Sequence, residues 1–167
     1  MDQKSAFDIL PHSIFREKLS VYNFDESSIC WIMSYLSGRT QVVQIENKTS
    51  SAIECGNLGT PQGSVLSLLF HILNCNDFPD CHFENEEVEG ILFVDDNSDN
   101  AHAKSRQELQ DMLQSEVNNS VSWLSDNKLC IAPDKSKLLV LGNQKLKESK
   151  LNDDIKITIN GLEICES

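Results

Sequence analysis

Two adjacent carboxylates, Asp95 and Asp96, follow directly after the apolar run at residues 91–94. Neighbouring side chains of a strand point to opposite faces, but at a turn this alternation relaxes and both carboxylates can approach one point. Because adjacent anions repel each other, a bound cation would stabilise such a turn. The pair predicts a metal site, and the alternative is a solvated turn in an acidic stretch, since Asp is common in turns.

A second acidic site lies at the start of the chain, where Asp2 and Asp8 flank residues 3–7. One Asp from a strand and one or two from a hairpin can hold two divalent ions, and oxygen ligands suit Mg²⁺ or Mn²⁺. Two metals about 3.5–4 Å apart can activate an attacking oxygen and stabilise a leaving one. Taken alone, the residues favour a frayed terminus for Asp2.

The charge distribution narrows the class of partner. The 167 residues carry a formal net charge of −12, and residues 77–126 hold 13 carboxylates against Lys104 and Arg106, a local charge of −11. Composition alone therefore argues against a generic polyanion binder and favours cationic partners. No apolar run reaches the length of about 18 residues that a membrane span needs. With no evident signal peptide and six cysteines that form no CxxC pair, we expect reduced thiols and an intracellular protein of the nucleus or cytoplasm.

The elements that must position these residues form a mixed pattern. Apolar residues at helical spacing predict helices over 12–22, 26–37, 64–76 and 105–125. Strands are expected over 40–46, 51–55, 91–94, 137–141 and 155–159, with the strand at 91–94 buried and with polar turns at 47–50 and 95–100. Glycines and a proline make residues 56–63 a loop. This count of helices and hairpins predicts an α+β fold of one domain.

Six motifs follow one another along residues 1–161. They are DQKSAFD at 2–8, SYLSGRTQ at 34–41, GTPQGSVL at 59–66, NDFP at 76–79, FVDD at 93–96, and NKL with PDKSK within 127–137. In this order they resemble the reverse transcriptases of non-LTR (LINE-type, jockey-like) retrotransposons. One such motif would be a weak signal, whereas six in order are specific.

The resemblance implies a polymerase palm over residues 1–167, an antiparallel sheet with helices packed on one face, truncated at both ends and without the N-terminal fingers part and the thumb. It implies an RNA-directed DNA polymerase whose partners are an RNA template, a DNA primer and a dNTP. Asp2, Asp95 and Asp96 would be the catalytic carboxylates, holding two Mg²⁺ (or Mn²⁺) ions for attack of the primer 3′-hydroxyl on the dNTP.

The resemblance also implies four substrate-binding residues. Phe7 would lie under the sugar and disfavour a 2′-hydroxyl, although it also suits plain core packing. Gln62 and Gly63 would lie near the template and the nascent pair. Lys135 would lie near the leaving pyrophosphate, and its alternative is an ordinary surface lysine.

The chain also departs from the family pattern. One residue is missing beside Ser67, which is expected to rotate the following helix or force a bulge, and Val94 and Asn97 replace the usual Ala and Thr. With flanking parts absent, we expect no primer extension by residues 1–167 alone. The alternative function is a degenerate or co-opted binding protein that keeps the palm fold without catalysis.

Overall fold

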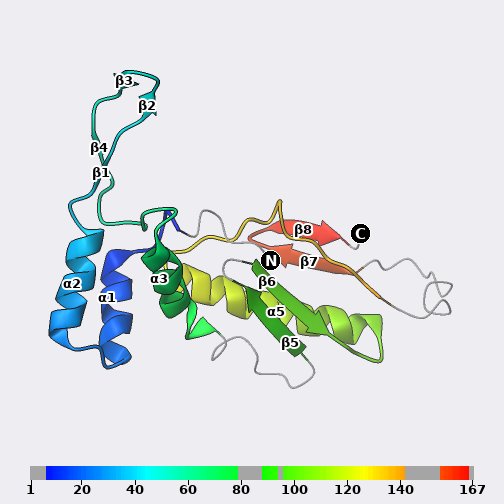
Figure 1. The fold of residues 1–167 in the computed structure, drawn as a ribbon. Helices are drawn as coiled ribbons and strands as arrows, with labels where there is room; N and C mark the ends of the chain where they lie inside the picture. The colour runs from blue at the N-terminus through cyan, green and yellow to red at the C-terminus, as the bar shows by residue number, and fades with distance from the viewer. Residues whose placement is uncertain (1–6, 79–87, 94–95, 142–154, 166–167) are drawn as a thin grey trace. The chain divides into compact units, whose positions relative to one another are not determined.

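Helices and two-stranded hairpins build the protein (Figure 1). The computed structural model describes residues 7–78, 88–93, 96–141 and 155–165. These residues fall into two compact units. The N-terminal unit holds residues 7–76 with Asn127–Leu129, and the C-terminal unit holds the described parts of Asp77–Asp126 and Cys130–Ser167. Four helices and four two-stranded antiparallel sheets among the described residues confirm the predicted α+β class.

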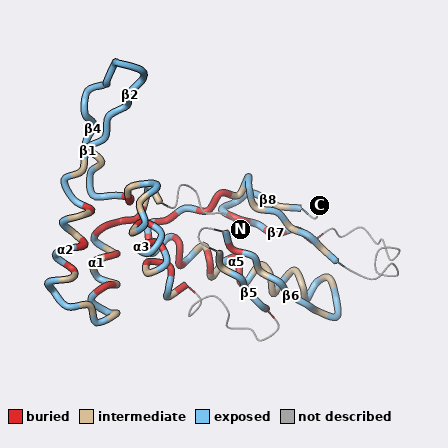
Figure 2. The backbone as a smooth tube through the Cα atoms, viewed as in Figure 1, coloured by how far each residue is buried: buried red, intermediate tan, exposed pale blue. Residues whose placement is uncertain are grey.

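Three helices form the core of the N-terminal unit: α1 (His12–Val21), α2 (Glu26–Leu36) and α3 (Val65–Cys75). All three match the predicted helices, because apolar residues at helical spacing give each helix a face to bury. Helix α1 packs against both α2 and α3, and the buried faces stand out in Figure 2. The buried cluster consists of Leu10, Phe15, Leu19, Ile29, Ile32, Leu36 and Phe70.

Helix α3 tests the expectation that the missing residue beside Ser67 forces a bulge. The helix runs without interruption from Val65 to Cys75, so the deletion produces no bulge. Ser64 caps its N-terminus by accepting a hydrogen bond from the backbone N–H of Leu66 at 3.3 Å. The Ser67 hydroxyl is buried and donates to the Pro61 carbonyl at 2.6 Å, which ties the first turn of the helix to the preceding loop.

An exposed hairpin connects α2 to the loop before α3 and extends away from the helices of its unit (Figure 1). Strand β1 (Thr40–Gln41) pairs with β4 (Ile53–Glu54), and β2 (Gln44–Ile45) pairs with β3 (Lys48–Thr49). The two predicted strands fall on its two arms, but the turn predicted at 47–50 is wrong. The register Ile45↔Lys48 leaves Glu46 and Asn47 as the turn, and Glu46 has the positive φ, 53°, that a two-residue hairpin loop needs at its first position.

A second hairpin carries the acidic segment of the C-terminal unit. Strand β5 (Val88–Phe93) pairs with β6 (Asp96–Ala101) in a register that runs from Val88↔Ala101 to Phe93↔Asp96. The polar turn predicted at 95–100 is therefore wrong from Asp96 onward, since pairing with β5 overrides the low strand propensity of Asp and Asn. The expectation of a buried strand also fails at Ile91, which is 61% exposed.

Helix α5 (Arg106–Asp126) packs against β6 and β7 of the same unit. It matches the predicted helix, and Val117, Trp123 and Leu124 are buried on it, while the Trp123 ring meets Phe78 edge-on at 5.0 Å. None of the described helices is long and apolar enough to cross a membrane.

Strand β7 (Lys156–Ile159) was predicted, but its partner β8 (Leu162–Cys165) was missed. Asn160 and Gly161 form the turn between them with φ of 49° and 81°, and Asn-Gly is a strong hairpin signal that the prediction overlooked. The strand predicted at 137–141 is wrong, because this segment forms only an isolated bridge at Leu138.

Two glutamines of α5 satisfy the backbone of β7. The Gln114 side chain accepts from the Thr158 N–H at 2.8 Å and donates to the Thr158 carbonyl at 3.0 Å. One turn earlier, Gln110 accepts from the Lys156 N–H at 3.2 Å. Among the described residues β8 is the strand that pairs with β7, and these contacts supply partners for backbone groups on the other edge of β7.

Candidate active site

A ladder of backbone hydrogen bonds joins the end of the first motif to the loop that carries the third. The N–H of Thr60 donates to the Phe7 carbonyl at 2.8 Å, and the N–H of Gly59 donates to the Leu10 carbonyl at 2.8 Å. The His12 N–H continues the ladder to the Asn57 carbonyl at 3.3 Å. Two segments about 50 residues apart in sequence are therefore held side by side within the N-terminal unit.

Gly59 lies where the backbones of these two segments approach each other closely. Its φ is +73°, and a Cβ atom added there would lie 2.6 Å from the backbone oxygen of Asp8. The buried ring of His12 supports the same point, because its Nε2 lies 2.8 Å from the Gly59 carbonyl and must donate to it. Only glycine fits this position without moving the backbone of Asp8.

Gln62 and Asp8 meet across this ladder. The Gln62 amide nitrogen donates to the Asp8 carboxylate at 2.9 Å. Both residues line a polar groove of about 710 Å³, together with Arg39 and Glu54 from the hairpin. Gly63 follows with φ +80° and no atom within 4 Å of a Cβ placed there, so its backbone is open to a close approach from outside.

Phe7 is half-buried beside the same ladder. Its ring centroid lies 5.0 Å from that of His71, a buried side chain of α3. The backbone bond to Thr60 and this ring contact fix Phe7 from two sides. Phe7 is therefore positioned by the core without being enclosed in it, which is compatible with contact to a ligand.

In the C-terminal unit, Asp96 begins β6 and forms the pair with Phe93 that closes the described part of the β5–β6 hairpin. Asp96 is exposed, whereas the next residue, Asn97, is buried, as the alternation of a strand requires. Asn97 donates to the Asp99 carboxylate at 3.3 Å. The carboxylate of Asp96 thus lies on the solvent-accessible face of β6 at its hairpin end.

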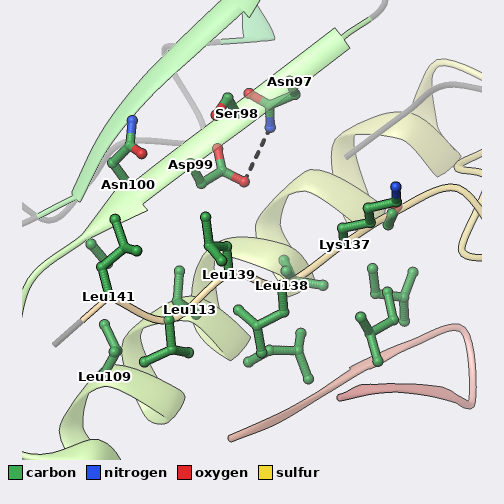
Figure 3. A pocket seen from close by; sticks show the side chains of 17 residues that line it. Asn97, Ser98, Asp99, Asn100, Leu109, Leu113, Lys137, Leu138, Leu139 and Leu141 are labelled. Atoms are coloured by element: carbon green, nitrogen blue, oxygen red, sulfur yellow. Dashed lines mark hydrogen bonds between the residues drawn. The ribbon is translucent and has the colours of Figure 1, made fainter. Parts of the chain in front are cut away.

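A separate pocket of about 470 Å³ lies between β6, α5 and the segment 136–141 (Figure 3). Figure 3 shows Asn97 and Asp99 on the strand side and Leu109 and Leu113 on the helix side. Asp96 is not among its lining residues. The candidate metal ligand and this mostly apolar pocket are therefore distinct features of the unit.

Lys135 lies in the turn that follows Ala132, where its N–H donates to the Ala132 carbonyl at 3.1 Å. Its side chain is exposed. Asp2 and Asp95, the other two predicted carboxylates, lie outside the described residues.

A family model described as reverse transcriptase (RNA-dependent DNA polymerase) matches residues 1–162. The chain belongs to the reverse transcriptase family. No curated protein matches the chain. Membership implies RNA-directed DNA synthesis from template, primer and dNTP as the family's activity, and members generally use divalent metal ions.

Within this reverse transcriptase, the structure brings Phe7, Gln62 and Gly63 together in the N-terminal unit, and it places Asp96 and Lys135 in the C-terminal unit. The sequence does not predict the link between Asp8 and Gln62, although Asp8 ends the first motif and Gln62 lies in the third. No periodicity could have revealed this pair, because its residues are 54 positions apart. The crowding of glycines at 56–63 was the available signal that two backbones meet there.

Proposed function

We propose that this chain is the palm region of a non-LTR (LINE-type, jockey-like) retrotransposon reverse transcriptase, which transfers the nucleotidyl group of a dNTP to a primer 3′-hydroxyl. The observation that carries the proposal is the position of Asp96 at the end of the β5–β6 hairpin, within a chain matched to the family over residues 1–162. The order of the six sequence motifs supports the non-LTR assignment.

The donor set fits divalent cations such as Mg²⁺ or Mn²⁺. Asp96 offers an exposed carboxylate, and carboxylate oxygens are the ligands that these hard cations prefer. We propose Asp2 and Asp95 as the further ligands; among the residues that the structure describes, no group of three His, Cys, Asp or Glu side chains is arranged to hold a metal ion. Two ions held there would stabilise the charge on the attacking and leaving oxygens.

The remaining residues of the proposal bind and orient the nucleotide. Phe7, fixed by His71 and the backbone ladder, would contact the sugar and disfavour a 2′-hydroxyl. Gln62 would contact the nascent pair, and the open backbone at Gly63 would let it approach closely. Lys135, as an exposed cation, would neutralise the leaving pyrophosphate.

The strong negative charge favours a second candidate, a palm-fold binding protein without catalysis. A local charge of −11 over residues 77–126 repels the phosphates of a primer–template, and affinity for nucleic acid depends on cations that neutralise phosphates. We therefore propose that residues 1–167 by themselves bind primer–template weakly and give no measurable primer extension.

The experiment that separates the two candidates is an exchange. Residues 1–162 replace the matched segment of an active reverse transcriptase of the same family, and primer extension is measured on an RNA template with Mg²⁺. The polymerase proposal predicts extension that Asp96→Ala abolishes and Asp99→Asn leaves in place. A hybrid that folds and binds primer–template but extends no primer would favour the non-catalytic candidate, and extension that survives Asp96→Ala would refute the carboxylate assignment.

A further inference from the structure

We infer that Asp8 is a positioning residue that orients the side-chain amide of Gln62 for contact with a nucleotide; this inference rests on the proposed function. The observation is the 2.9 Å hydrogen bond from the Gln62 amide nitrogen to the Asp8 carboxylate. An ionised carboxylate can only accept hydrogen bonds, so Gln62 must present its nitrogen to Asp8. The Gln62 oxygen is then directed away from Asp8 as an acceptor.

The backbone around the pair makes this orientation persistent. Both side chains are exposed, and a hydrogen bond between two flexible exposed groups competes poorly with water. Here the two chain segments are locked together at Phe7–Thr60 and Leu10–Gly59, and Gly59 brings the backbones of both segments into contact. Because the ladder already fixes the two backbone segments, the hydrogen bond between Asp8 and Gln62 forms with little further loss of conformational entropy.

The groove also offers groups that suit the ligand of the proposed function, a nucleoside triphosphate. Gln62 supplies an acceptor for a sugar hydroxyl or a base N–H, and Arg39 on the same groove supplies a cation that suits phosphate. A nucleoside triphosphate carries both kinds of group. The bond between Asp8 and Gln62 also joins the first motif, which holds Phe7, to the Pro-Gln-Gly motif. The same contacts between these two segments therefore position Phe7 and Gln62, the two residues that the proposed function places against the nucleotide.

The test is a double-mutant cycle between Asp8 and Gln62, with the dissociation constant of dTTP measured by calorimetry in Mn²⁺ on the whole chain. Asp8→Ala and Gln62→Ala are each expected to weaken dTTP binding about fivefold, the equivalent of one hydrogen bond, and the double variant no further. Asp8→Asn, which keeps an acceptor oxygen, is expected to stay within about twofold of the wild type. Glu17→Ala, which removes an exposed carboxylate of α1 that does not line the groove, serves as the matched control and is expected to change little.

Two further measurements separate the possible failures. The Gln62 side-chain amide resonances, assigned by their loss in Gln62→Ala, should shift in Asp8→Ala without a change in the urea midpoint. Additive effects of the two substitutions, unshifted resonances, or a loss of dTTP binding that only follows a loss of stability would each overturn the positioning role. Wild-type dTTP binding that Asp96→Asn does not weaken would refute the proposed function, whereas dTTP binding that depends on Asp96 but not on the Asp8–Gln62 coupling would refute this inference alone.

Discussion

Substitution of Gly59 by alanine should destabilise the N-terminal unit far more than the same substitution at Gly56, three residues earlier in the loop. Both glycines have positive φ, +73° and +66°, so each alanine carries a conformational cost of about 1–2 kcal/mol. At Gly56 no atom lies within 4 Å of the added Cβ, so the alanine adds no steric clash to the conformational cost. At Gly59 the Cβ would lie 2.6 Å from the Asp8 carbonyl oxygen, which requires one backbone segment to move.

That movement strains the ladder. The bonds from Gly59 to Leu10 and from Thr60 to Phe7, both 2.8 Å, join the segments on either side of the clash, and each contributes about 1 kcal/mol. We therefore expect Gly59→Ala to lower the free energy of unfolding by about 3–4 kcal/mol, about 2 kcal/mol more than Gly56→Ala. Urea unfolding followed by circular dichroism gives the two values, and hydrogen exchange of the Thr60 amide localises the loss. Equal losses in the two variants would refute the close packing of residues 7–12 against the loop.

Three other expectations follow from single contacts. His12→Leu removes the donor to the Gly59 carbonyl and should cost about 1–3 kcal/mol in urea unfolding, whereas His12→Gln, which keeps a donor, should cost less; an equal loss would argue against the bond. Hydrogen bonds from the Ser28 hydroxyl and N–H hold the pKa of Asp25 below its ordinary value. The stability contributed by Asp25 is therefore present above the unfolded-state pKa of about 4 and is lost as the pH falls through the lower folded-state pKa. Asp25→Asn should flatten the acid limb of the stability–pH curve, and an unchanged limb would contradict this. Gln114→Ala removes both bonds to β7 and should cost about 1–3 kcal/mol, against little for the exposed Gln107→Ala; similar values for the two would show that the β7 edge needs no side-chain partner.

The helices could be predicted from the sequence because their signal is periodic and local. Leu109, Val117 and Leu124 recur at spacings that only a helix brings to one face, and the helix formed there within two residues of the predicted ends. The strands were harder, because a strand is stabilised by a partner that the local sequence does not specify. Asp96–Ala101 contains no strong strand former, and it is a strand because β5 supplies its hydrogen bonds.

The candidate site also has one part that the sequence predicts and another that depends on tertiary packing. Gln62 and Gly63 could be named from the resemblance, which specifies residue types at given spacings. The bond to Asp8 and the ring contact between Phe7 and His71 depend on tertiary packing between segments more than 50 residues apart, which no local pattern encodes. The exposed position of Asp96 follows from strand alternation, because the next residue of β6, Asn97, is buried.

The central claim is that Asp96, which begins β6, binds the divalent ions of a reverse transcriptase together with Asp2 and Asp95. The most direct measurement is a Mn²⁺ titration of the ¹⁵N-labelled chain, with paramagnetic broadening of each backbone amide resonance as the readout. We expect broadening to be strongest at Asp96 and its immediate neighbours, with a roughly millimolar dissociation constant, since the nucleotide phosphates that would complete the coordination are absent from the titration. Asp96→Asn should weaken binding severalfold, while Asp99→Asn, whose side chain lies on the other face of β6, should leave it unchanged. Broadening centred elsewhere in the chain, or wild-type affinity in Asp96→Asn, would contradict the claim.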